Sequence, residues 1–261
     1  MVTALNLLFI TYHRTTSVPE TDDVHTVTNK QFARHIELIL QAGVSVADAH
    51  VLEVQQPRAG HQIAITFDDG FKSDIANAEL LASYGLTAMF FISTANIGQE
   101  GYMDEGDIRR LDGMGMLIGS HSHQHKRLNK RPEAEARTQL ELSKQRLESI
   151  LRHPVEYLAF PGGGYNASVI AMATAVGFRY MLTTDWGVNA VTDNLAGRLY
   201  KRNNILQNMS DREFTRLITL KSIHIRKLIF LVKQWLRTLL PEKGYGALRK
   251  VILRSNGKTT F

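Results

Sequence analysis

Short apolar runs alternate with stretches in which apolar positions recur at helical spacing. The runs predicted to be strands are 5–12, 63–67, 87–92, 116–119, 155–160, 178–183 and 199–205. The predicted helices are 28–43, 74–84, 107–114, 132–151 and 168–176. Thr28 and Gln31 resemble a capping box at the start of the first, and Ser210 is a further candidate N-cap. Such alternation is typical of an α/β protein with parallel strands covered by helices, either a closed barrel or an open doubly wound sheet. We favour the barrel, with candidate chemistry at the carboxyl ends of its strands.

Composition supports one large folded domain and restricts its chemistry. The chain has 261 residues, of which 44% are hydrophobic, so a large core is possible in a single α/β barrel. It contains no cysteine, which excludes disulfides, zinc–thiolate sites and cysteine nucleophiles. Any bound metal must therefore be held by His, Asp or Glu.

The positive charge of the chain belongs to its last part. The net charge is +6, yet residues 221–261 hold ten basic side chains and one acidic one, which leaves residues 1–220 with a net charge of −3. Apolar residues recur at helical spacing from Ile225 to Leu239, with basic residues between them. This pattern predicts a basic amphipathic helical tail, either lying on an anionic membrane surface or docked on the barrel with its basic face outward. The charge favours the membrane, and no recognisable motif points to nucleic acid.

The N-terminal segment predicts the compartment. Residues 1–13 have neither a basic leader nor a small-residue cleavage site, so they do not resemble a signal peptide. We therefore expect a cytoplasmic protein, which the basic tail would hold at the inner face of the membrane. Such a location would suit a glycan that is built on a lipid carrier.

Segment 66–70 (TFDDG) places two carboxylates at the end of a predicted strand. Asp68 and Asp69 would repel each other unless one of them binds a cation, which would leave the other free to act as a base. Read alone, the same segment is also a plausible Asp-Asp-Gly turn.

Segment 120–125 (SHSHQH) follows a later strand and holds three of the ten histidines. His121 and His125 are four residues apart, so a helical turn or a converging loop would bring both to one ion. Borderline metals such as zinc accept imidazole together with carboxylate, so Asp69 could complete the set. For His123 alone, a solvated polar loop is the better interpretation.

Segment 160–165 (FPGGGY) ends another strand in proline and three glycines. Glycine lets the backbone approach a ligand closely, and its exposed N–H groups could stabilise an oxyanion. Taken alone, such a loop is more often a simple turn.

In this order, the three segments resemble the polysaccharide deacetylase family, also called the NodB-homology or carbohydrate esterase family 4 domain. The resemblance covers roughly residues 5–215, and we predict a catalytic barrel over 1–215 with a tail over 216–261. It implies a distorted (β/α)7-type barrel with one divalent metal at the strand ends. Carried over, Asp69, His121 and His125 are the metal ligands and Asp68 is the catalytic base. Zinc is the expected metal, with cobalt, nickel, iron and manganese also open.

The resemblance also assigns substrate contacts to the glycine loop. Pro161, Gly162 and Tyr165 are the candidate substrate-binding residues, and the backbone near Gly162 is the candidate oxyanion site. The segment Asp185-Trp186 could join them, although a loop tryptophan could equally pack on the barrel mouth.

The chain departs from the family pattern in two places. Many members carry an arginine where this chain has Ala159, and we expect Arg198 or Arg202 to replace it by pairing with Asp68. Many members also take their general acid from a C-terminal Leu-x-His strand, which is not evident here. Instead, His13 ends the first strand in a Tyr-His pair, which resembles the permuted branch that includes poly-N-acetylglucosamine deacetylases. We therefore expect His13 to be the acid, although it could also be a structural strand-end histidine.

The predicted function is removal of acetyl groups from N-acetylated amino sugars of a glycan. In a second hypothesis the chain is a catalytically silent glycan-binding or scaffold module. In a third, the same barrel and metal act on a non-sugar amide or on an O-acetyl ester, because the ligand set does not encode the leaving group.

Overall fold

The computed structural model describes residues 5–19, 23–54, 60–191 and 196–221. It divides the chain into two compact units, Met1–Gln207 and Asn208–Phe261. The tail helix predicted around 225–239 lies outside the described residues, so its membrane contact remains a prediction. Among the described residues, no helix is both long and apolar enough to span a bilayer.

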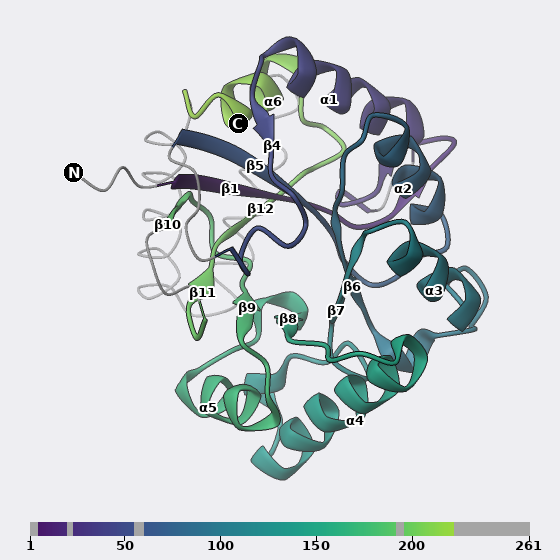
Figure 1. Cartoon of the computed structure of the whole chain (residues 1–261), viewed down its shortest axis with the longest axis vertical. Helices are drawn as coiled ribbons and strands as arrows, with labels where there is room; N and C mark the ends of the chain where they lie inside the picture. Colours follow the sequence, from purple (N-terminus) through teal and green to yellow (C-terminus); the bar gives the residue numbers. More distant parts are fainter. Residues whose placement is uncertain (1–4, 20–22, 55–59, 192–195, 222–261) are drawn as a thin grey trace, which may run out of the picture. The chain divides into compact units, whose positions relative to one another are not determined.

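The first unit is a nearly closed, barrel-shaped parallel sheet (Figure 1). Its strands follow the order β1 (Leu5–Tyr12), β5 (Gly60–Phe67), β6 (Met89–Ile92), β7 (Leu117–Ser120), β8 (Tyr157–Ala159), β9 (Tyr180–Leu182) and β11 (Leu199–Tyr200). The barrel is completed by β12 (Arg202–Asn204), which pairs in parallel with β1. This confirms the predicted distorted (β/α)7-type barrel, in which the first and last strands are neighbours.

Among the described residues, four short strands lie outside this ring. They are β2 (Thr15–Thr16), β3 (Val27–Thr28), β4 (Ser45–Val46) and β10 (Asn189–Val191). The first two pair with each other, β4 pairs in parallel with β5, and β10 runs antiparallel to the start of β1. None of them was predicted from the sequence.

The predicted strand 199–205 is two strands, divided at Lys201. The side chain of Asn189 donates to the Lys201 carbonyl at 3.0 Å and accepts from its N–H at 2.9 Å. Because a side chain satisfies the backbone here, the ladder is interrupted, and the chain moves from pairing with β9 to pairing with β1. The interruption distorts the barrel where it closes.

In the part of the first unit that the structure describes, five α-helices connect the strands and cover the outside of the sheet (Figure 1). They are α1 (Asn29–Gln41), α2 (Asp74–Ser83), α3 (Glu105–Gly113), α4 (Glu133–Leu151) and α5 (Ala167–Val176). As predicted, the Thr28 hydroxyl caps α1 by accepting from the Gln31 N–H at 3.0 Å. In the second unit, Ser210 and Glu213 form a capping box at the start of α6 (Asp211–Ile218).

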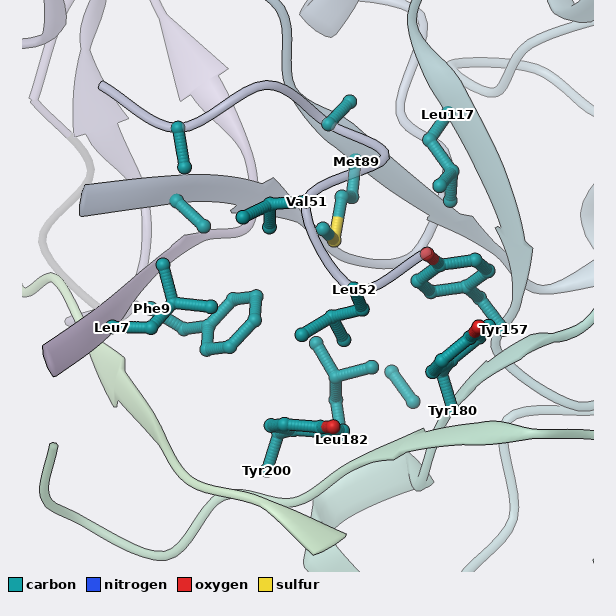
Figure 2. Close-up of a cluster of buried hydrophobic side chains, with 14 of the residues drawn as sticks. Leu7, Phe9, Val51, Leu52, Met89, Leu117, Tyr157, Tyr180, Leu182 and Tyr200 are labelled. Atoms are coloured by element: carbon teal, nitrogen blue, oxygen red, sulfur yellow. The ribbon is translucent and has the colours of Figure 1, made fainter. Parts of the chain in front are cut away.

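Apolar side chains fill the interior of the barrel (Figure 2). Phe9 and Tyr200 meet there with ring centroids 5.9 Å apart, and Leu52 enters from the segment between β4 and β5. Burying each such side chain stabilises the fold by roughly 1.5–3 kcal/mol. The interior is thus packed with apolar side chains, and Asp68, Asp69 and His121 follow the ends of β5 and β7.

Candidate active site

Asp68 and Asp69 lie where β5 ends. The Asp68 N–H donates to the Tyr12 carbonyl at 3.0 Å, which continues the β1–β5 pairing by one more step. Asp69 then turns the chain with a φ of 76°, a left-handed conformation that is uncommon for a residue other than glycine. A Cβ at Gly70 would lie 3.1 Å from Ile92 Cδ1, so glycine allows this turn to pack closely on β6. Backbone strain of this kind occurs preferentially at functional sites.

Asp69, His121 and His125 converge as predicted. Asp69 Oδ1 lies 3.5 Å from His121 Nε2 and 3.0 Å from His125 Nε2, and one ligand atom from each residue lies within 4.8 Å of the others. No helix carries the two histidines. Left-handed conformations at Ser122 (φ 58°) and His125 (φ 53°) bend the loop, and the ring centroids of His121 and His125 lie 5.0 Å apart.

This cluster fits a divalent metal ion. Asp69 Oδ1 is buried, and although both histidine nitrogens are close, neither makes a well-directed hydrogen bond to it. His121 Nδ1 lies 2.8 Å from the Ala159 carbonyl and must donate to it, which leaves the Nε2 lone pair facing Asp69. Burial lowers the pKa of His121, which favours the neutral imidazole that a metal requires.

Asp68 is paired with Arg202 in the interior. Arg202 Nη1 and Nη2 donate to the two carboxylate oxygens at 2.6 and 2.8 Å, and the side chains are 0% and 2% exposed. Burial alone would raise the pKa of Asp68, but the guanidinium outweighs it and holds this pKa well below the usual range. Arg202 thus takes the place of the arginine missing at Ala159, as expected, whereas Arg198 is exposed.

His13 follows β1 and lies next to the aspartate pair. Burial lowers the pKa of His13, and the negative charges of Asp68 and Asp69 act in the opposite direction. Its Nδ1 is buried and has no hydrogen-bond partner among the described residues. The ring of His25 lies 4.9 Å away, a neighbour that the sequence did not indicate. His13 therefore lies near Asp68 and Asp69, as its predicted role as the general acid requires.

The glycine loop offers one backbone donor. Pro161 begins a 3₁₀ turn that ends at Gly163, and Gly162 (φ 55°) and Gly163 (φ 66°) are both left-handed. The N–H groups of Gly163, Gly164 and Tyr165 donate to carbonyls within the loop. Among the described residues, no carbonyl accepts the Gly162 N–H, so it is available to a ligand.

Tyr165, at the end of the glycine loop, contacts the segment that follows β9. Its hydroxyl donates to Asp185, and its ring stacks on Phe160 with centroids 5.3 Å apart. Burial, reinforced by the Asp185 carboxylate, raises the pKa of Tyr165 to about 12, so the hydroxyl stays protonated. Asp185 thus holds a loop residue that was predicted to bind substrate.

The fold and the site together define an α/β barrel with an Asp-His-His cluster and a second, arginine-paired aspartate at the strand ends. Residues 55–181 match the family model described as polysaccharide deacetylase. The chain is 27% identical over 156 residues to a peptidoglycan-N-acetylglucosamine deacetylase of Bacillus cereus, which covers 56% of this chain and 55% of that protein. Residues 55–181 therefore belong to a polysaccharide deacetylase domain of the NodB-homology, carbohydrate esterase family 4 class, as the resemblance implied.

Two solved structures share the fold. The Streptococcus pyogenes deacetylase PplD, in complex with acetate, superposes with a TM-score of 0.72 at 19% identity, covering 83% of this chain and 99% of that one. IcaB from Ammonifex degensii gives a TM-score of 0.69 at 20% identity with the same coverage of both chains. At this level of identity, the two structures show the fold of the barrel and not its substrate.

Proposed function

We propose that the chain is a metal-dependent hydrolase that removes acetyl groups from N-acetylated amino sugars of a polysaccharide or of its lipid-linked precursor. Its proposed setting is exopolysaccharide or cell-envelope glycan metabolism. The observation that carries the proposal is the convergence of Asp69, His121 and His125 on one point, next to Asp68 and His13. A metal-dependent hydrolase of acetamides uses a cation, a base and an acid, and this arrangement supplies candidate residues for all three.

Asp69, His121 and His125 would hold one divalent ion, for which zinc is the first choice and cobalt, nickel, iron and manganese are alternatives. When bound, the ion supplies Lewis acidity that polarises the acetyl carbonyl and acidifies the attacking water. The Nδ1 bond to the Ala159 carbonyl orients His121 for this task.

The remaining steps use side chains and backbone of the chain itself. Asp68, kept ionised by Arg202, accepts a proton from the attacking water as its oxygen bonds to the acetyl carbon. The Gly162 N–H stabilises the oxyanion that develops. His13 gives its proton to the nitrogen as the carbon–nitrogen bond breaks, so acetate and a free amine leave. This chemistry requires an ionised base and a protonated acid at the same pH. Arg202 favours the ionised form of Asp68, and the carboxylates of Asp68 and Asp69 favour the protonated form of His13 against its burial.

Acetate release tests the proposal. The chelated and the zinc-loaded protein would be incubated with N-acetylglucosamine oligomers, O-acetylated glycans and simple non-sugar acetamides. We expect acetate from the N-acetylated oligomers with the loaded protein only. Acetate from the esters or simple amides alone would support the alternative substrate class. Metal binding without acetate from any substrate would support a silent glycan-binding module.

The location of the chain at a membrane stays a separate proposal. It rests on the charge of residues 221–261 in the sequence. Sedimentation of the full chain with anionic and with neutral vesicles at low salt would test it. Equal binding to both kinds of vesicle, or none to either, would contradict it.

A further inference from the structure

Arg127 lies directly on the glycine loop of the candidate site. A Cβ at Gly162 would lie 2.9 Å from its Nε, and a Cβ at Gly164 would lie 2.8 Å from its Cα. A hydrogen bond also holds the loop to the segment that carries Arg127, because the Asn129 N–H donates to the Gly164 carbonyl at 3.1 Å. Only glycine at 162 and 164 therefore allows this arginine to rest on the loop backbone.

The charge of Arg127 is not compensated by the part of the chain that the structure describes. No carboxylate of those residues lies within 4.0 Å of its guanidinium, and the side chain is exposed. The neighbouring cations differ, because Lys126 and Arg131 each lie 3.9 Å from Glu135. Of these three basic residues, Arg127 is the one without an ion-pair partner among the described residues, and it is also the one that packs on the glycine loop.

The position of Arg127 indicates which part of a bound substrate its guanidinium would contact. It follows the candidate ligand His125 by two residues and has its Nε beside Gly162, whose N–H is available to a ligand. It is exposed, whereas Asp68 and His121 are each only 2% exposed. A group reached by Arg127 therefore lies at the rim of the site and belongs to the part of the substrate outside the reacting acetamide.

We propose that Arg127 binds an anionic oxygen group, a carboxylate or a phosphate, that the glycan carries close to the acetylated sugar. The planar guanidinium matches both groups with two parallel hydrogen bonds, and such charge-assisted bonds are stronger than neutral ones. This inference rests on the proposed deacetylation and adds a substrate preference to it. The enzyme would select acidic glycans over neutral ones of equal length.

Matched substrates test the preference. Acetate release would be measured for a neutral N-acetylglucosamine oligomer, for one that carries a lactyl carboxylate and for one that carries a phosphate ester. For the preferred acidic oligomer, Arg127→Gln is expected to raise KM about tenfold at nearly unchanged kcat, and Arg127→Lys is expected to lie in between. The neutral oligomer should be affected little by either change. Which acidic oligomer shows the effect identifies the source of the anion.

Arg152→Gln is the matched control. Arg152 is also exposed and without an ion pair among the described residues, but it caps α4 at the opposite end of the barrel. Its variant should keep the preference of the wild type. Equal kcat/KM of the wild type for neutral and acidic oligomers would overturn the proposal, as would an unchanged preference in Arg127→Gln.

Direct binding separates this inference from the proposed function. Calorimetric titration with N-acetylmuramic acid, N-acetylglucosamine 6-phosphate and N-acetylglucosamine needs no turnover. Tighter binding of an acidic sugar that is lost in Arg127→Gln would support the anion site even if no acetate were released. Equal binding of all three sugars would refute the anion site even if the protein proved to be an active deacetylase.

Discussion

Removal of the Arg202 side chain should destabilise the barrel, because it leaves the buried Asp68 carboxylate without its cationic partner. In Arg202→Met, the carboxylate of Asp68 keeps its 2% exposure and loses both of its hydrogen bonds from the guanidinium. Breaking a buried ion pair by removing one partner costs about 3–5 kcal/mol, because the remaining charge is uncompensated. Arg179→Met is the matched control, since its ion pair with Glu156 is exposed and should contribute less than about 1 kcal/mol.

The assay is urea unfolding of chelated protein, so that no bound cation compensates Asp68. Because the folded pKa of Asp68 is depressed, its stabilising effect is present above the unfolded carboxyl pKa of about 3.9 and is lost as the pH falls through the folded pKa. The difference between wild type and Arg202→Met should therefore shrink in acid. Asp68→Asn combined with Arg202→Met should recover much of the loss. A cost below about 1 kcal/mol at neutral pH would refute the reasoning.

Three further predictions concern other parts of the chain. Asp69→Asn should weaken zinc binding by more than about 100-fold in a chelator competition. Substitution of residues that merely hydrogen-bond to metal ligands already lowers metal affinity by about 10–100-fold. An affinity close to that of the wild type would exclude this ligand set. Gly163→Ala should lower the free energy of unfolding in urea by about 2 kcal/mol or more, because a Cβ at this left-handed position would collide with the Thr184 hydroxyl. Gly43→Ala, which has a similar φ but open space around it, should lower it by about 1 kcal/mol. Equal losses in the two variants would contradict this. His153→Gln should lower the free energy of unfolding by less than about 1 kcal/mol at pH 5.5 and leave it unchanged at pH 8.5. Against the effect of partial burial, Asp112 raises the pKa of His153, so this stabilisation is lost as the pH rises through the folded pKa. A loss of stability that grows with pH would contradict it.

Much of the fold was predictable because local signals agree with it. The apolar run 5–12 is a strand with the predicted ends, and the caps at Thr28 and Ser210 begin helices as expected. Strand β10 was not predictable, because three residues carry no period and their pairing depends on β1, far away in the sequence. The interruption at Lys201 depends in the same way on pairing that the local sequence does not show, because the Asn189 side chain bonds to both backbone groups of Lys201.

The site was predictable to the extent that its residues cluster in sequence. Asp68 and Asp69 form one segment, and the histidine loop forms another. The partnership with Arg202 was expected as one of two candidates, with Arg198, because the resemblance implies an arginine where this chain has Ala159. Its bidentate geometry comes from β12 lying against β1. The contact between His13 and His25 was missed, because the sequence does not show which loop folds over the end of β1.

The most direct test of the account compares the wild type with Asp68→Asn at equal zinc content. Acetate and free amine released from an N-acetylglucosamine oligomer would both be quantified, with circular dichroism as the control for folding. The account predicts equal amounts of acetate and amine from the wild type, and a large loss of both in the folded, zinc-loaded variant. Undiminished release by Asp68→Asn, or acetate without amine from the wild type, would contradict it.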